Sequence, residues 1–219
     1  MALNKLKFNS INVTPSANKA LKFNSSADGF ETGAAGGAMT FIKKLTASSS
    51  STLSFVDGSS DVVLDNTYKE YIFVFKHIHP ASDSVSFDFN LSIDSGSNYN
   101  VTKTTTLFRT SHDEADSYTQ FGYNANEDLA QSTADQHITY GIGNGSDECA
   151  SGIFHLFNPS STNFVKHFMS TACSYAATPG VNEMFVAGYG NTTSAVDAVQ
   201  FKMSSGNIDS GTITLYGIN

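Results

Sequence analysis

The sequence predicts an all-β fold: an antiparallel β-sandwich of the jelly-roll type, preceded by an extended N-terminal arm. Two observations carry this prediction. Short segments of alternating apolar and polar residues, separated by turn-forming residues, recur along most of the 219 residues. Charged residues make up only 15% of the chain, whereas Ser (30), Thr (21) and Asn (18) together supply 69 residues. This composition favours strands and turns over helical bundles, which need Glu, Lys, Arg and Leu.

The first 38 residues are predicted to form the arm. Leu6-Lys7-Phe8-Asn9-Ser10 recurs as Leu21-Lys22-Phe23-Asn24-Ser25, and each copy places Leu and Phe on one face of an extended chain. Neither copy is long enough to bury this face by itself, and the residues from Gly33 to Ala38 have the composition of a flexible hinge. We therefore expect an arm that becomes ordered against a partner; a chance repeat in a low-complexity leader is the alternative.

Residues 39–219 are predicted to form the sandwich. The clearest strand is 85–93, in which Val85, Phe87, Phe89, Leu91 and Ile93 alternate with polar residues. Strands are also expected at 40–46, 52–56, 68–77, 99–109, 137–142, 149–157, 164–175, 184–189, 196–203 and 212–218. One short helix is expected at 126–135. So many short strands with so little helix are typical of a jelly roll.

The charge is divided unevenly along the chain. Residues 1–44 carry six Lys against Asp28 and Glu31, a formal +4, and the remainder carries six basic and 18 acidic residues, a formal −12, which sums to −8. An acidic body excludes nonspecific nucleic-acid binding, which needs a basic face. The basic leader indicates attachment. The residues expected to make that attachment are Lys5, Leu6, Lys7, Phe8, Lys19, Leu21, Lys22, Phe23, Phe30, Lys43 and Lys44.

Targeting and redox signals are sparse. No apolar run approaches the ~20 residues of a membrane span, and the first residues lack the apolar core of a signal peptide. Cys149 and Cys173 are predicted to be two buried free thiols; the alternative is that they face each other on neighbouring strands. We expect no membrane association and synthesis in a reducing compartment.

The best enzymatic pattern is His77-Ile78-His79, followed by Asp83. Residues two apart on a strand point the same way, so this pattern is similar to the metal ligands of cupin jelly rolls. Cupins, however, have Glu where Asp83 stands, and Pro80 is expected to interrupt the strand. Further ligands would have to come from His137, His155 or His167, none of which lies in a recognisable motif, and His155 and His167 are better explained as satisfied interior histidines. We therefore predict no catalytic residues, no bound metal and no cofactor.

Two loops offer other chemistry. The acidic loop 112–116 is expected to be solvated, and an ion site there is the minority alternative. The polar loops 111–128 and 143–149 suit sugar binding, the first through its Tyr and Asn side chains, although the chain has no Trp. Nucleophile-elbow, zincin, phosphate-binding and dinucleotide-binding motifs do not occur.

From about Thr46 to the end, the chain resembles virion-associated structural proteins of marine tailed bacteriophages. The resemblance is carried by the Ser/Thr tract before Leu53 and by the segments 68–73, 79–81, 128–132, 152–159 and 164–167. Its most specific part is the ending, Ser204-Ser205-Gly206-Asn207-Ile208-Asp209-Ser210-Gly211 followed by 212–218. Such proteins are described as tail fibre or virion proteins, so the resemblance implies a particle component and brings no catalytic residues.

Three functions follow, in order of preference. The first is a non-enzymatic virion protein, either a capsid decoration (cement) protein or a fibre-like projection. It would be made in the host cytoplasm, joined to capsid or tail proteins by its arm, and assembled as a homo-oligomer, with a homotrimer the first expectation by analogy. The second is a receptor- or glycan-binding module of a tail fibre or tail tip. The third, remote, is a cupin-like metalloenzyme.

Overall fold

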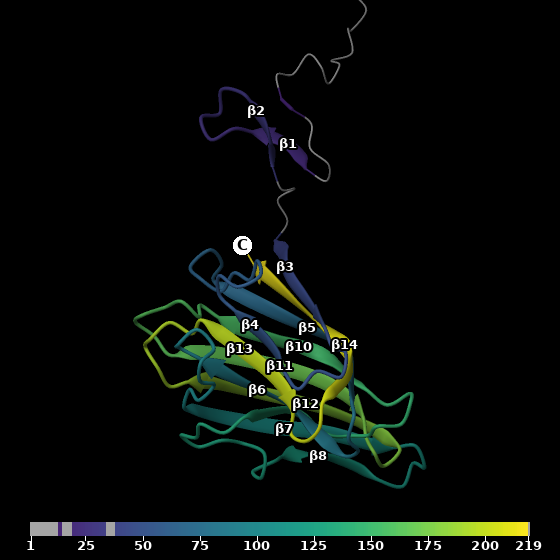
Figure 1. Cartoon of the computed structure of the whole chain (residues 1–219). Coiled ribbons are helices and arrows are strands. Elements are labelled where there is room, and N and C mark those ends of the chain that lie inside the picture. Colours follow the sequence, from purple (N-terminus) through teal and green to yellow (C-terminus); the bar gives the residue numbers. More distant parts are fainter. Residues whose placement is uncertain (1–12, 15–18, 34–37, 219) are drawn as a thin grey trace, which may run out of the picture. The chain divides into compact units, whose positions relative to one another are not determined.

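The computed structural model describes residues 13–14, 19–33 and 38–218 (Figure 1). These residues contain fourteen β-strands and no helix, which confirms the predicted all-β class. The strands are β1 (Ala20–Phe23), β2 (Phe30–Gly33), β3 (Met39–Thr46), β4 (Leu53–Val56), β5 (Glu70–Pro80), β6 (Val85–Ser92), β7 (Lys103–Asp113), β8 (Thr119–Tyr123), β9 (Gln136–Ile142), β10 (Ala150–Phe157), β11 (Lys166–Tyr175), β12 (Gly180–Gly190), β13 (Ala198–Met203) and β14 (Ile208–Ile218). The chain divides into two units, Met1–Ala38 and Met39–Asn219. The second unit is called the body below.

The body contains two antiparallel sheets. One has eight strands in the order β3-β14-β5-β10-β11-β12-β7-β8, and the other has four in the order β4-β13-β6-β9. From β4 onward the chain passes repeatedly between the sheets: β4, β6, β9 and β13 belong to the small sheet, and the strands between and after them belong to the large one. Successive segments of the chain therefore add strands to the two sheets in turn.

The two sheets pack face to face over an apolar core, as in a β-sandwich. Phe201 of β13 lies 5.4 Å from Phe73 of β5, measured between ring centroids. Phe89 of β6 lies 4.5 Å from Phe154 of β10, so rings of the small sheet contact rings of the large sheet at several points. All the core residues come from Ala47 onward, so the core belongs wholly to the body.

The alternation predicted for residues 85–93 is confirmed at Phe87, Phe89 and Leu91, which are buried, but not at Ile93, which follows the end of β6 and is 42% exposed. Its polar side differs from the prediction, since Asp88 and Asn90 are buried too. The segment that precedes β9 covers them: Asn90 donates to the Thr133 carbonyl oxygen (3.1 Å) and to Asp135 (2.9 Å).

Several predicted boundaries are wrong. The helix expected at 126–135 is absent; this part consists of turns and of an isolated bridge at Ser132 to Lys103. β8 was not predicted, because its apolar residues are exposed at a sheet edge: Phe121 is 77% exposed. β5 continues through Pro80 instead of stopping before it, because Pro80 pairs with Ile208 at the far end of β14, where the register is irregular.

The described part of the predicted arm is a hairpin, not a single extended segment. Leu21 pairs with Thr32 and Phe23 with Phe30 across β1 and β2. Asn24 closes the turn, since its backbone N–H donates to the Gly29 carbonyl oxygen (3.0 Å) and its amide donates to Asp28 (2.8 Å). Residues 34–37 of the predicted hinge lie outside the described residues.

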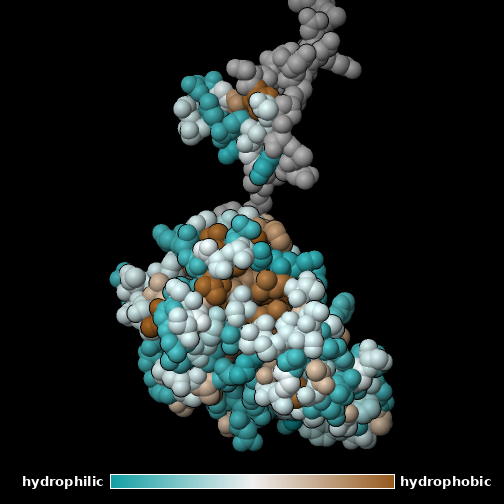
Figure 2. All heavy atoms as spheres, in the orientation of Figure 1, coloured by the Kyte–Doolittle hydropathy of each residue, from teal (hydrophilic) through white to brown (hydrophobic). Residues whose placement is uncertain are grey.

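Apolar residues also reach the surface of the body. The face shown in Figure 2 is largely hydrophilic, with brown side chains gathered where Figure 1 draws β3 to β5. Met39 and Phe41 of β3, the strand at one edge of the large sheet, are 48% and 59% exposed.

Candidate functional site

The predicted attachment residues fall into three groups. Lys5, Leu6, Lys7 and Phe8 lie outside the described residues. Lys19, Leu21, Lys22, Phe23 and Phe30 lie in or beside the hairpin, and Lys43 and Lys44 lie in β3 of the body. The hairpin and β3 belong to different units, and each is described by itself.

The hairpin presents an uncovered apolar face. Phe23 and Phe30 stack with their centroids 4.9 Å apart, yet they are 66% and 44% exposed. Lys22 pairs with Glu31 at 3.1 Å across the two strands. Because a lone two-stranded hairpin is marginally stable in water, this apolar face is the kind of surface that a partner stabilises.

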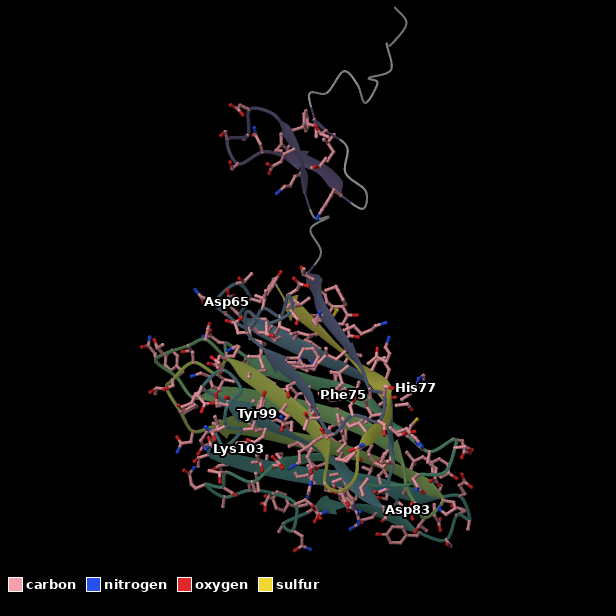
Figure 3. The ribbon with its side chains drawn as sticks, in the orientation of Figure 1. Asp65, Phe75, His77, Asp83, Tyr99 and Lys103 are labelled. Carbon is pink, nitrogen blue, oxygen red and sulfur yellow. The ribbon has the colours of Figure 1, made fainter. Side chains whose placement is uncertain are left out.

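The His77 and His79 pair, the remote candidate for a metal site, lies at a β-bulge. His77 is the extra residue of the bulge: its φ is 51° and the pairing of β5 shifts register on both sides. His79 is held elsewhere, with Nδ1 2.6 Å from the Glu148 carbonyl oxygen. Figure 3 labels His77 and Asp83 at separate places on the body. No group of three His, Cys, Asp or Glu residues among the described residues is arranged to hold a metal ion.

One carboxylate of the acidic loop 112–116 closes the loop through hydrogen bonds to nearby backbone groups. Asp113 Oδ1 accepts the backbone N–H groups of Ser117 (2.8 Å) and Tyr118 (2.9 Å), and the Ser117 side chain and these backbone groups lower the pKa of Asp113. Asp116 pairs with His112 at 3.1 Å. The loop is therefore shaped by its own hydrogen bonds.

Four other side chains differ from the prediction. Cys149 and Cys173 are both free, as expected, but neither is buried: Cys149 is half-buried and Cys173 is exposed. His155 and His167 are not interior: His167 is exposed, and His155 is half-buried with Nδ1 2.6 Å from Glu70. Cys173, His155 and His167 project from the outer side of the large sheet, because Phe168, Ala172 and Phe154 fill the inward positions beside them.

A charged network lies on the outer side of the small sheet. His137 of β9 lies between two carboxylates, with Nδ1 2.5 Å from Asp88 and Nε2 3.1 Å from Glu127. Burial alone would lower the pKa of His137, but the hydrogen bond and charge of Asp88, with Glu127, raise it above 6.5. Nearby, Lys202 pairs with Asp135 at 2.8 Å. Both imidazole nitrogens are thus occupied, so the network ties the 124–135 segment to the sheet.

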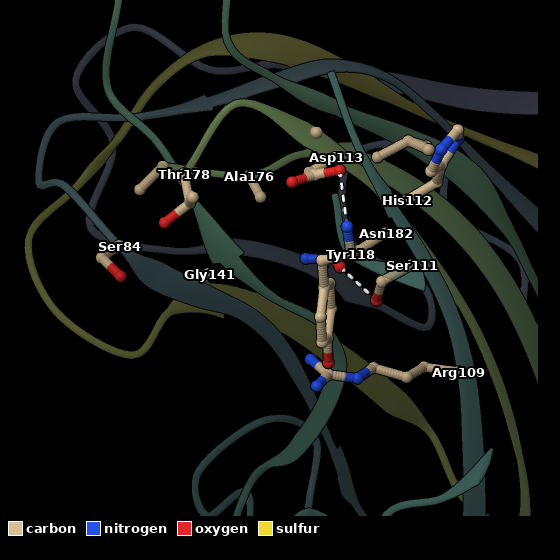
Figure 4. A pocket seen from close by; sticks show the side chains of 13 residues that line it. Ser84, Arg109, Ser111, His112, Asp113, Tyr118, Gly141, Ala176, Thr178 and Asn182 are labelled. Carbon is tan, nitrogen blue, oxygen red and sulfur yellow. Dashed lines mark hydrogen bonds between the residues drawn. The ribbon is translucent and has the colours of Figure 1, made fainter. Parts of the chain in front are cut away.

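A cavity lies between the sheets, at the end of the sandwich where β7, β9 and β12 meet. It has a volume of about 310 Å³ and is lined by Arg109, Ser111, Asp113, Tyr118 and Asn182, together with the 176–178 turn (Figure 4). The Arg109 guanidinium lies 4.9 Å from the centre of the Tyr140 ring. This Arg109 pocket falls within the range of small-ligand sites, at its lower end.

Sequence reasoning pointed to one wall of this pocket, the 111–128 loop, but missed Arg109 and Asn182. A signal was present in the strands. Inward positions of β7 and β12 are apolar at Leu107 and Val186, and then become polar at Ser111 and Asn182, which pair with each other. That signal needs the pairing of the two strands, which the sequence alone does not reveal.

Comparison with protein families, with curated proteins and with solved structures finds no match for this chain. None of the described residues belongs to a helix that could span a bilayer.

Proposed function

We propose that this chain is a non-enzymatic structural component of a bacteriophage particle, a capsid decoration (cement) protein or a fibre-like projection. It joins capsid or tail proteins through residues 1–38, together with Lys43 and Lys44, and its body faces outward. It resides in the virion and associates as a homo-oligomer, with a trimer as the expected state by analogy with the three-fold and six-fold sites of capsids and tails.

The observation that carries the proposal is the N-terminal hairpin. It belongs to a unit separate from the body, and its stacked Phe23 and Phe30 are largely exposed. Residues 1–38 carry four Lys against Asp28 and Glu31, a formal +2, whereas the body carries eight basic and 18 acidic residues, a formal −10. A sticky, basic attachment unit on an acidic body is what a protein added to the outside of a particle needs.

The body fits this role as a jelly roll. We infer that class from the alternate placement of successive strands in two sheets and from the small-sheet order β4-β13-β6-β9. Three strands, β10 to β12, stand between β5 and β7 of the large sheet, so the jelly roll is an expanded one. Jelly rolls are common among viral coat domains, an argument from fold class alone.

The proposal is tested by removing residues 1–38. We expect the truncated protein to remain soluble and folded but to be missing from purified particles, as measured by quantitative mass spectrometry of virions. A double variant, Phe23→Ser with Phe30→Ser, should lower incorporation in the same direction. The matched control is Phe164→Ser, which changes a side chain of the body that is 70% exposed. Normal incorporation of the truncated chain would overturn attachment by this unit.

A second candidate function is recognition of a host receptor or glycan by the body. The specific observation that favours it is the Arg109 pocket, which lies where polar loops gather at one end of the sandwich. Binding of the full chain to host cells, lost on changing pocket residues but kept after changing the hairpin, would support recognition over decoration. The cupin-like metalloenzyme is not proposed, because no three His, Cys, Asp or Glu side chains among the described residues lie together as metal ligands.

A further inference from the structure

We propose that the Arg109 pocket binds one neutral pyranose unit of a glycan. This inference deepens the second candidate function and rests on it, and it does not depend on attachment through the hairpin.

The pocket lies where the inward rows of two adjacent strands change from apolar to polar residues. Arg109 pairs with Met184, and Ser111 pairs with Asn182, in the two adjacent strands β7 and β12. One step further into the sandwich the same inward rows hold Leu107 and Val186, which are buried in the core. Polar groups placed at inward positions cost stability unless they are paired, so their clustering at one end needs a reason other than packing.

Two donors in this cluster have no acceptor among the described residues. Arg109 donates to Gln120 through one terminal nitrogen, but its Nε is the single buried side-chain nitrogen or oxygen there that lacks any partner. Asn182 accepts from the Ser111 hydroxyl at 2.7 Å through its carbonyl oxygen, which leaves its amide N–H groups facing the pocket residue Gly141. A ligand that supplies acceptor oxygens would satisfy the Asn182 amide directly, and it would meet Arg109 Nε, which has almost no contact with solvent, after a small shift of the Arg109 side chain.

The opposite side of the pocket supplies an acceptor. In Figure 4 the Asp113 carboxylate and the Arg109 guanidinium lie at different ends, with the Tyr118 side chain between them. A sugar hydroxyl both donates and accepts, so hydroxyls of one ring can meet Asp113 at one end and Arg109 at the other. The Tyr118 ring, half exposed, offers an aromatic face on which the apolar side of a pyranose can pack.

Charge decides between neutral and acidic sugars. The positive charge of Arg109 is balanced within the pocket by Asp113. Asp116 lies beside the pocket, and the body as a whole has a formal −10, from eight basic and 18 acidic residues. A carboxylated or sulfated sugar would therefore enter against the field of the body, whereas a neutral sugar does not feel it.

The test uses a spectroscopic property of this sequence: Arg109 is its only arginine, so its Nε–H gives one isolated NMR signal. The full-length protein is titrated with the methyl glycosides of glucose, galactose, mannose and N-acetylglucosamine, and separately with glucuronate and with inorganic phosphate. We expect at least one neutral glycoside to shift the Arg109 Nε–H signal saturably and to slow its exchange with water. Glucuronate and phosphate should shift it less.

Variants then tie the signal to the pocket. Tyr118→Ala should weaken binding of the same glycoside about tenfold, the loss expected for about 1.4 kcal/mol of contact. Tyr123→Ala is the matched control, since Tyr123 is an exposed tyrosine close by in sequence that does not line the pocket, and it should bind as the wild type does. Arg109→Lys keeps the charge but removes the planar donor fork, and should also weaken binding about tenfold.

Three results would overturn the inference: no shift with any neutral glycoside, a larger shift with glucuronate or phosphate, or equal losses from Tyr118→Ala and Tyr123→Ala. Host-cell binding by the same full-length protein is measured alongside. Cell binding that persists without any sugar shift would refute the pocket and leave receptor recognition standing. Loss of both would refute the second candidate function as well.

Discussion

At the scale of single residues, His137 has an unusual position, because both of its ring nitrogens face carboxylates. Asp88 is almost fully buried, and burial raises its pKa, while the hydrogen bond and charge of His137 act in the opposite direction. The imidazolium form of His137 therefore stabilises the ionised carboxylate of Asp88 inside the protein. The other charges facing this site are Glu127, Asp135 and Lys202.

This arrangement predicts a stability that depends on pH. The pKa of His137 is higher in the folded protein than its ordinary 6.5, so its contribution is fully present below 6.5 and is lost as the pH rises through the raised value. The free energy of unfolding should fall over that window by up to about 1.4 kcal/mol per pH unit. Denaturant titrations at several pH values should show a smaller fall in His137→Gln.

The control for that experiment is His112→Gln, because His112 forms an exposed pair with Asp116 that contributes little. Its pH dependence should match that of the wild type. A wild-type stability that rises with pH above 6.5 would contradict the assignment.

Phe201 supports a second prediction for a single side chain. It is fully buried, and its ring lies 5.2 Å from Phe75 and 5.8 Å from Phe87, so it joins rings of both sheets. Phe201→Ala should cost about 3–5 kcal/mol of unfolding free energy in a denaturant titration. Phe164→Ala, at an exposed position, should change it by less than about 0.5 kcal/mol, and equal effects would argue against this packing.

The inward residues were largely predictable from the sequence, whereas the pocket was not. Alternation alone places Phe87, Phe89 and Leu91 in the core, because a period of two is a property of every strand. The pairing of Ser111 with Asn182 joins residues far apart in the chain, and no local pattern encodes it.

At the scale of elements, the bulge in β5 depends on a glycine in the neighbouring strand. Gly211 of β14 has a φ of +117°, and a Cβ there would lie 2.5 Å from the His77 carbonyl oxygen. Gly211→Ala should therefore destabilise the body by more than about 2 kcal/mol, measured as a shift in the unfolding transition.

Gly58→Ala is the matched control. Gly58 also has a positive φ, +72°, but a Cβ there would contact nothing within 4 Å, so only the backbone strain of about 1 kcal/mol should appear. If the two substitutions were equally costly, the close approach at the bulge would not be the cause.

Most strands of the body were predicted because their apolar residues alternate over a half-buried sheet. The errors arose where tertiary contacts decide the outcome. Residues 126–135 form no helix because their backbone groups bond to other segments; the Leu129 carbonyl oxygen accepts from Thr105, and the Ser132 carbonyl oxygen accepts from Lys103. The hairpin in the leader was hidden by the shortness of its strands.

At the scale of the whole molecule, the body should fold without the N-terminal unit. Every residue of the apolar core lies between Ala47 and Leu215, and residues 1–38 form a separate unit. The chain lacking residues 1–38 should therefore show the same thermal midpoint as the full chain by circular dichroism. A clear loss of stability would mean that the leader contributes to the body.

The order of strands also determines when the body can form during synthesis. β13 lies between β4 and β6, and β14 lies between β3 and β5. Strands from the first half of the chain are therefore joined into their sheets only when the last two strands are placed between them. A nascent chain therefore holds both sheets incomplete, with unpaired edges and exposed Phe side chains, until residues up to Ile218 have left the ribosome. Because these pairings join distant residues, folding of the body should be slow and should wait for the synthesis of β14. Production of the protein is thus expected to be sensitive to ribosome stalling and to chaperone supply, even though the finished body is well packed.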